Sequence, residues 1–225
     1  MASSVRSRGG RRGLTRREVA RTAVRIGDRE GLEAVTFRRL AAELSVTPMA
    51  VHHHVSDRDG LHTEMLAALL DAFDVLAGID PVLPWAEQLR GALLSLHAFN
   101  RCHPVLAQLL LSDAPRPPVV FRTTERFIGL LLKAGFPPQM AVEVARIIIH
   151  QHDGLLLVEA GSARAGHTSG AAARQAELRL LELPANEFPS VVAFSQQISR
   201  LDLDNWRDLA TDITVRGLTA LLAAL

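Results

Sequence analysis

The sequence predicts an all-α protein in which an N-terminal three-helix domain precedes a larger helical domain, with about nine to ten helices in total. Alanine and leucine, both strong helix formers, are abundant. Aromatic residues make up only 4% of the 225 residues and tyrosine is absent, whereas β-rich folds favour aromatic and β-branched runs. Apolar residues recur at helical spacing, and no segment alternates in the manner of a strand.

The first three expected helices lie within residues 14–60, and each has an identifiable start. Thr15, Thr36 and Thr47 can cap them, because a threonine hydroxyl satisfies a free amide of the first helical turn. Gly31 is placed to end the first helix. These signals predict three short, separate helices rather than one long one.

Residues 36–55, TFRRLAAELSVTPMAVHHHV, have the pattern of a helix-turn-helix. Two short amphipathic helices are joined by a turn of about three residues, and in such a motif the second helix enters the major groove of DNA. Val51 and Val55, four residues apart, form the inward side of that second helix. Its outward side is free to meet base edges and phosphates and consists of Pro48, Met49, His52 and His53.

Residues 61–225 are expected to form one helical domain. A long fourth helix, capped by Asp57, is expected to extend to about Leu76. Residues 161–175 are small and polar and are expected to be a mobile loop. The remaining helices are expected over residues 85–101, 104–112, 119–134, 137–160, 188–200 and 204–225.

Charge is divided unevenly along the chain. Residues 1–60 carry 12 arginines against 7 acidic residues, net +5, and residues 61–225 carry 13 basic against 17 acidic residues, net −4. A basic head on a mildly acidic body indicates a polyanionic partner at the N-terminal end. Residues 1–13 are rich in Ser, Gly and Arg and are expected to be a disordered basic tail without the apolar stretch of a secretory signal.

The cysteine content and the hydropathy pattern indicate a cytoplasmic protein. The single cysteine, Cys102, excludes an intrachain disulfide, so nothing suggests an oxidising compartment. The apolar runs are short and are broken by charges, so no membrane span is expected.

Residues 15–73 resemble the DNA-binding domain of the tetracycline-repressor (TetR) family of bacterial transcriptional regulators. In that family a threonine opens the second helix, and the recognition helix ends in Tyr-x-His-Phe with a Lys or Arg just beyond. His52 stands here in place of the tyrosine and Val55 in place of the phenylalanine. The resemblance is carried by residues 36–41, 44–55 and 57–61.

The resemblance implies a set of DNA contacts. Thr36 would hold a phosphate with its hydroxyl and the free amides of its helix start, and Met49 suits a thymine methyl. His52 can donate to a phosphate, and because imidazole titrates near neutrality we expect the DNA affinity to depend on pH. The expected DNA-contacting residues are Thr36, Arg38, Thr47, Pro48, Met49, His52, His53 and Arg58.

The C-terminal half resembles the ligand-binding and dimerisation domain of the same family, on residues 84–90, 103–104, 133–136 and 150–154. The resemblance implies a homodimer in which the two long helices near residues 137–160 and 204–225 pair with their copies. The apolar surfaces of these helices have to be buried against a partner. A dimer would also place two recognition helices about 34 Å apart, which allows them to read a palindromic operator. The expected interface residues are Ile147, Gln151, Leu155, Leu209, Ile213, Gly217 and Leu221.

A small hydrophobic or aromatic effector is expected in this half, because ligand pockets place a few polar groups on an apolar wall. The tetracycline repressors hold drug and Mg²⁺ with a His and a Thr at positions that align with Leu111 and Ala114, so tetracycline–Mg²⁺ is not the expected effector. Arg101 and His152 are further polar groups in apolar surroundings. The expected effector-binding residues are His97, Asn100, His103, Phe121, His150 and Asp153.

The function that these features favour is a ligand-responsive DNA-binding regulator, most simply a repressor released by its effector. One alternative, a helical enzyme, lacks a phosphate-binding glycine loop, a cysteine metal set and a nucleophile signature, so no catalytic residue and no cofactor are expected. No metal site is expected either, because the consecutive side chains of residues 52–54 project about 100° apart on a helix. A second alternative is a helical protein-interaction module without sequence-specific DNA binding, which absent or salt-insensitive DNA binding would favour.

Overall fold

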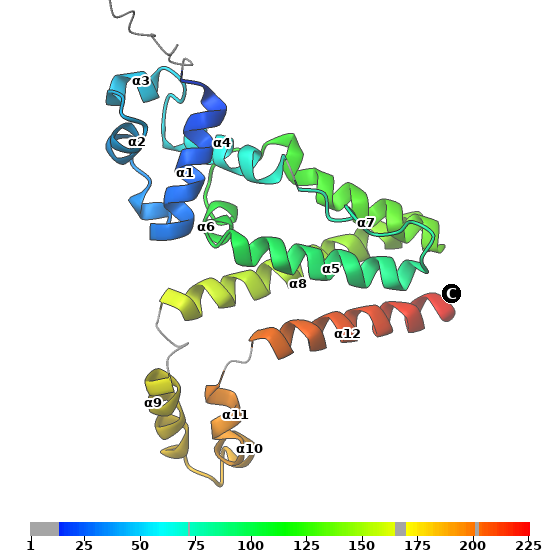
Figure 1. Ribbon diagram of the computed structural model, residues 1–225. Helices are drawn as coiled ribbons and strands as arrows, with labels where there is room; N and C mark the ends of the chain where they lie inside the picture. Colours follow the sequence, from blue (N-terminus) through cyan, green and yellow to red (C-terminus); the bar gives the residue numbers. More distant parts are fainter. Residues whose placement is uncertain (1–13, 72, 165–169, 201–202) are drawn as a thin grey trace, which may run out of the picture.

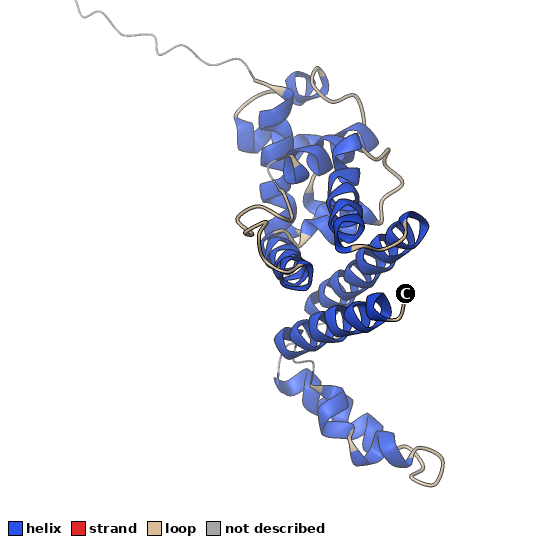
Figure 2. Cartoon of the chain, turned by 90° about the vertical axis from the view of Figure 1, so that its right-hand side faces the viewer, coloured by secondary structure: helices blue, strands red, loops and turns tan. Residues whose placement is uncertain are grey.

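The computed structural model describes residues 14–71, 73–164, 170–200 and 203–225. Within these ranges the chain contains twelve α-helices, two short 3₁₀ helices and no strand (Figures 1 and 2). The all-α prediction is confirmed, and the number of helices exceeds the nine to ten expected. The expected tail, residues 1–13, lies outside the described residues.

The N-terminal head begins with three capped helices. Each predicted threonine cap is present: the Oγ1 atoms of Thr15, Thr36 and Thr47 accept a hydrogen bond from the backbone N–H three residues ahead, at 3.2, 3.1 and 3.2 Å. Gly31 ends the first helix with φ +86°, a conformation that favours glycine. The helices are α1 (Arg16–Glu30), α2 (Phe37–Leu44) and α3 (Pro48–His52), with a 3₁₀ turn η1 (Leu32–Ala34) after α1.

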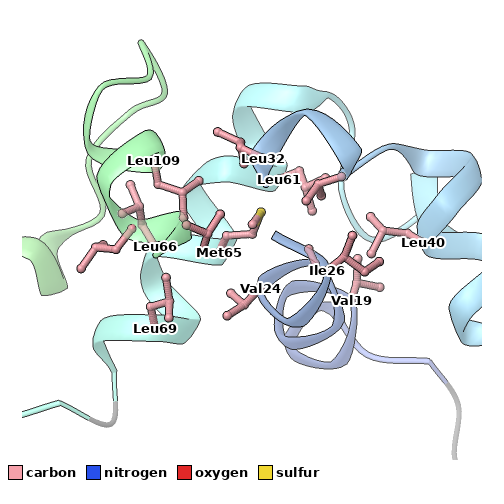
Figure 3. Packing of buried hydrophobic residues seen from close by; sticks show 14 of the residues in the cluster. Val19, Val24, Ile26, Leu32, Leu40, Leu61, Met65, Leu66, Leu69 and Leu109 are labelled. Carbon is pink, nitrogen blue, oxygen red and sulfur yellow. The ribbon is translucent and has the colours of Figure 1, made fainter. Parts of the chain in front are cut away.

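One hydrophobic core joins this head to the next helices of the chain. Helix α4 (Arg58–Leu70) packs on α1, and α6 (Val105–Leu110) closes the same core from the other side (Figure 3). The proposed domain boundary after residue 60 is therefore crossed by continuous packing. The largest fully buried side chains of this core are Val19, Ile26, Leu40, Val51, Leu61, Met65, Leu66 and Leu109.

The body contains a second core between long helices. Helix α5 (Trp85–Cys102) lies against α7 (Phe121–Ala134) and α12 (Leu203–Ala223), and α7 packs on α8 (Pro138–Arg164). A 3₁₀ turn, η2 (Pro118–Val120), leads into α7. The fully buried members of the core include Val75, Leu89, Ala92, Phe127, Leu131, Ala141 and Ala145.

Three further helices form an arm that projects from the body (Figures 1 and 2). They are α9 (Gly170–Leu181), α10 (Pro189–Ala193) and α11 (Ser195–Ser199), and they pack mainly on one another. The single helix expected over 188–200 is thus two short helices, because Phe194 between them leaves helical geometry with φ −108° and ψ 21°.

Two other sequence predictions need correction. Residues 161–164 and 170–175 of the expected loop are helical, and only residues 165–169 lie outside the described residues. Alanines 171–173 are strong helix formers and favour helix over a small, polar loop.

The fourth helix was also expected to be longer than it is. It ends at Leu70 instead of near Leu76. The physical reason combines a local and a distant contact of Asp74: its Oδ1 atom accepts the Leu76 N–H at 3.1 Å, and its Oδ2 atom binds Arg126 of α7 at 2.6 Å. A hydrogen bond of this kind occupies a backbone N–H that a longer helix would need for its own bonding, so it favours an earlier end of the helix.

Helices α1 and α6 approach each other closely at Gly27. A Cβ added at Gly27 would overlap Val105 Cγ2, and valine has little rotamer freedom to move aside. We expect Gly27→Ala to destabilise the protein by about 1–2 kcal/mol in urea unfolding, because overpacking outweighs the helix propensity gained.

Gly129→Ala is the matched control for that substitution. It lies within α7, and a Cβ there meets nothing within 4 Å. It should stabilise the protein by about 0.5–1 kcal/mol. Equal effects of the two substitutions would contradict the tight contact between α1 and α6.

Candidate nucleic-acid interface and effector cavity

The third helix has the inward and outward sides that the sequence predicts. Val51 is fully buried and Val55 is 3% exposed, so both hold the helix on the head core. Pro48, His52 and His53 are exposed, and Met49 is 64% exposed. Helix α3 lies at the end of the molecule that is far from the arm (Figure 1).

The other expected DNA contacts are exposed on neighbouring elements. Thr36 caps α2, Thr47 caps α3, and Arg58 opens α4 directly after its cap Asp57. Arg38 and Arg58 are exposed and form no ion pair within the described part of the chain, so both charges are available to phosphates.

Arg39, one residue after Arg38, has a different role. Its guanidinium binds Glu43 at 2.6 Å and Glu30 at 3.1 Å. The hydrogen bond that Arg39 donates to Glu43 is the main reason why the pKa of Arg39 is raised, and the same bond lowers the pKa of Glu43. Arg39 therefore ties α2 to the end of α1, while Arg38 faces solvent.

An aromatic stack fixes the residue that replaces the family's tyrosine. The rings of Phe37 and His52 lie with centroids 3.9 Å apart and planes inclined by 6°. This contact joins the first residue of α2 to the last residue of α3 and holds the imidazole of His52 in one plane. Sequence reasoning missed Phe37, because nothing in the spacing of residues 37 and 52 indicates a ring contact.

A buried polar cluster lies between α5, α8 and α12. The imidazoles of His97 and His152 have centroids 4.4 Å apart, and Asn100 Nδ2 is hydrogen-bonded to His152 Nε2. Thr211 of α12 is 2% exposed and belongs to the same region. His97, His152 and Thr211 border a cavity of about 10 Å³, whose other lining residues are Leu93, Ile148, Gln151, Leu155, Ala210 and Thr214.

The histidines of this cluster are neutral. Burial, followed by the charges of His97 and Arg207, lowers the pKa of His152 to about 3. Burial likewise lowers the pKa of His97. Arg207, the nearby cation, is bound by Glu159 at 2.7 Å, and both side chains are largely buried.

The structure does not bring the remaining effector candidates into this cavity. Phe121 is 60% exposed on α7, and His150 is exposed on α8. Asp153 is partly buried, which is the main reason why its pKa is raised. His103 lies at the end of α5, where its Nδ1 atom is 2.9 Å from Asp28 Oδ2 of α1. Of the expected residues, His97 and Asn100 share the cluster.

Sequence reasoning missed Thr211 as a cavity residue. The only signal was its position four residues before Val215, which is buried on the same side of α12. A threonine among apolar neighbours looks like an ordinary helix residue until the helix against it is known.

The corner between α5 and α6 is bonded to the head. Asp28 Oδ1 accepts the Val105 N–H at 3.2 Å, and Gln108 Oε1 accepts the Leu32 N–H at 2.9 Å. His103, bonded to the same Asp28, follows Asn100 by three residues. One helical turn thus separates the contact of Asn100 with His152 from a contact to the DNA-binding head.

One face of α8 and α12 is apolar and uncovered in the single chain. Ile147 and Ile213 are each 62% exposed, and Leu209 is 52% exposed. Val144 and Ile148 of the same helix, α8, are buried in the chain's own core. A groove of about 360 Å³ runs along this face and is lined by Gln151, Gly154, Leu155, Val158, Trp206, Leu209, Ala210 and Ile213.

These features together define a class of protein, a helical DNA-binding regulator with a separate ligand-binding body. A family model described as "Tetracyclin repressor-like, C-terminal domain" matches residues 80–221. The chain belongs to this tetracycline-repressor family and is a ligand-responsive, DNA-binding transcriptional repressor. Among the described helices, none has the length and apolar character required to cross a membrane.

Individual relatives support this assignment. The chain is 28% identical over 142 residues to tetracycline repressor protein class E of Escherichia coli, covering 63% of this chain and 67% of that protein. It is 26% identical over 206 residues to the HTH-type transcriptional repressor DrrR1 of Streptomyces coeruleorubidus, covering 89% and 76%.

Solved structures agree in fold. Apo ActR of Streptomyces coelicolor superposes with a TM-score of 0.78 at 28% identity, covering 96% of this chain and 99% of that chain. ActR in complex with actinorhodin gives a TM-score of 0.76 at 29% identity, covering 93% and 97%.

Acidification should destabilise the fold through the buried histidines. Because the pKa of His152 is about 3 in the folded chain and 6.5 is its ordinary value, the unfolded chain takes up the proton first as the pH falls below 6.5. The free energy of unfolding should drop by on the order of a few kcal/mol between those values, and His62 and His97, whose pKa values burial also lowers, add to the drop. Urea midpoints across this range should fall less steeply for His152→Gln, and an identical slope would refute the assignment.

Proposed function

We propose that this repressor binds a palindromic operator as a homodimer, in the cytoplasm, and is released by a small hydrophobic or aromatic effector held between α5, α8 and α12. In this proposal residues 14–60 form the DNA-binding domain and residues 61–225 the effector-binding and dimerisation domain. The observation that carries the DNA-binding part is the two-sided character of α3. Its valines anchor it, while Pro48, Met49, His52 and His53 face outward.

We assign each exposed residue a role in DNA binding from its chemistry. Met49 offers an apolar contact to a thymine methyl, and His53 offers a hydrogen bond to a base edge. Arg38, Arg58 and the capping threonines are suited to phosphates, since arginine charges and free helix amides both bind anions. Phosphate contacts fix the register of the head, and α3 reads the sequence.

A homodimer is supported by the uncovered apolar face of α8 and α12. Exposed isoleucines and leucines at this density are uncommon on a monomer and mark an interaction surface. Self-association across a two-fold axis would cover them and place two recognition helices for one palindrome. The proposed interface residues are Ile147, Gln151, Leu155, Leu209, Ile213, Gly217 and Leu221.

The effector is proposed to bind at the cavity of His97, Asn100 and His152. ActR, a similar protein, has been solved in complex with actinorhodin and with (S)-DNPA. The positions aligned with the family's Mg²⁺ ligands, Leu111 and Ala114, carry no oxygen ligand in their side chains, which supports an effector other than tetracycline–Mg²⁺.

Release of DNA requires that the effector prefer a body conformation that holds the heads at the wrong spacing. The bonds from Asp28 to His103 and Val105 support a route for this coupling, because they join the turn that carries Asn100 to α1. The angle of α4 would change with them, since α4 packs on both α1 and α6.

The double substitution Met49→Ala/His53→Ala tests base readout while leaving the cap and the buried valines intact. Two lost base contacts should weaken binding to a selected palindrome about 10- to 100-fold. The measurement is enrichment of genomic fragments on the purified protein, followed by titration of the enriched sequence at several salt concentrations.

The matched control for this experiment is Gln139→Ala/Glu143→Ala, an exposed pair with the same spacing on α8. This variant should bind the selected palindrome with the same affinity as the unchanged protein. If the folded protein enriched no DNA at low salt, the helical protein-interaction module would become the better assignment.

The substitution Ile213→Asp tests the dimer. A charge placed in the centre of the apolar face should convert a dimer into a monomer at micromolar concentration, as measured by light scattering of the eluting protein. Leu111→Asp is the control, because Leu111 is 67% exposed but lies outside α8 and α12. A protein that is monomeric before substitution would disprove the proposed interface.

A further inference from the structure

The imidazole of His52 is packed on its face and free at its edge. Phe37 stacks on one face of the ring, with centroids 3.9 Å apart and planes inclined by 6°. His52 is exposed, and neither of its ring nitrogens has a hydrogen-bond partner within the described part of the chain. Imidazole carries at least one N–H in the plane of its ring, so the stack leaves a donor available to a group outside the protein.

The ring plane matters more for a histidine than for the tyrosine that the family usually has at this position. A tyrosine hydroxyl lies on the axis of the bond between Cβ and Cγ, so rotation about that bond leaves the oxygen in place. Both nitrogens of His52 lie off this axis, and the same rotation moves them. The torsion is only broadly restricted in a free side chain, so a histidine needs a neighbour to fix its donor.

Helix α3 is anchored by other contacts as well as by this stack. Its two valines are buried in the head core, and Thr47 caps its first turn. Just beyond the helix, Arg16 Nε donates to the backbone carbonyl of His54 at 3.0 Å. These contacts hold the backbone, so loss of the Phe37 ring would leave the helix in place and free the side chain of His52.

The stack also brings the two elements that suit phosphate close together. Phe37 directly follows Thr36, whose hydroxyl caps α2. The ring of His52, although it belongs to α3, therefore lies beside the start of α2. The free amides of a helix start and an imidazole N–H both suit the phosphate oxygens of a DNA backbone.

From this geometry we infer that Phe37 is a positioning residue for DNA binding, whose ring fixes the imidazole of His52 so that an edge N–H meets a backbone phosphate. Phe37 acts through His52 and need not touch DNA itself. A side chain that is ordered beforehand loses less conformational entropy on binding, so its contact is stronger. The inference rests on the proposed contact between His52 and phosphate, and it adds the residue on which that contact depends.

Phe37→Leu is the variant that tests this role, because leucine removes the ring and keeps an apolar side chain against the head core. Phe37→Tyr is the conservative variant, since it keeps a ring that can stack. The matched control is Phe73→Leu, which removes the stack of Phe73 on Phe99, with centroids 4.1 Å apart, outside the helix-turn-helix.

The position of the imidazole is measured without DNA, by NMR of protein that contains isotope-labelled histidine. The ring protons of His52, identified by their absence in His52→Ala, should be shifted upfield by the ring current of Phe37. Phe37→Leu should abolish this shift, and Phe37→Tyr and Phe73→Leu should keep it.

DNA affinity is then measured on the enriched palindrome and on a scrambled duplex of the same length. Phe37→Leu should weaken binding to both by about three- to tenfold, because an ordered donor is lost and a phosphate contact carries no sequence information. In the His52→Ala background the same substitution should have no further effect, since the two residues act as one unit. In the His52→Tyr background the loss should be less than about twofold, because the hydroxyl lies on the rotation axis. Phe37→Tyr and Phe73→Leu should bind as tightly as the unchanged protein.

Two results would overturn the inference. An equal loss of affinity in the presence and absence of the His52 imidazole would show that Phe37 only supports the helices, and unchanged affinity of Phe37→Leu would show that the stack has no role in binding. If His52→Ala itself binds DNA as tightly as the unchanged protein, the proposed phosphate contact fails, and the role of Phe37 fails with it. A protein in which His52→Ala weakens binding but the cycle shows no coupling keeps the proposed contact and loses only the positioning role.

Discussion

The contact between α1 and α6 is the constraint on which the rest of the molecule depends. At Gly27 the helices approach so closely that no side chain fits, and after it in the sequence Asp28 and Leu32 are hydrogen-bonded to α6 and to the α5–α6 corner. The head is small and could not build a large core by itself, so it shares one with the body. Any rearrangement of α5 and α6 must therefore change the packing or the position of the DNA-binding head.

The recognition element itself is minimal. Helix α3 has five residues and would not persist alone in water. It is held by the cap at Thr47, the burial of Val51 and Val55, and the stack of His52 on Phe37. Met49 and His53, which also face outward, make no packing contact of this kind, so they can change to suit one DNA sequence without loss of the fold.

Much of this arrangement could be predicted from the sequence, because local signals decide it. Threonine caps, the glycine at position 31 and the spacing of the buried valines are all properties of short segments, and the structure confirms them. The early end of α4 was not predictable in this way, since it depends on Arg126, which lies about fifty residues away in sequence.

The proposed effector cavity was only partly predictable for the same reason. His97 and Asn100 share a helical face, but the pairing with His152 and the approach of Thr211 arise when three distant helices meet. His103 illustrates the opposite error, because a histidine in apolar surroundings can equally bind a carboxylate of the neighbouring domain. Sequence spacing gives candidates, and only packing decides which of them meet.

The buried pair of Arg207 and Glu159 has a consequence for how such proteins diverge. Removing one member of a buried ion pair strands the other charge and costs about 3–5 kcal/mol, whereas exchanging both for apolar residues is nearly neutral. These two positions are therefore expected to change together during evolution. The charge of Arg207 acts on both His97 and His152, so a lineage that replaces the pair also changes the electrostatics of the proposed effector cavity, and a new ligand specificity can arise in one coupled step rather than by gradual drift.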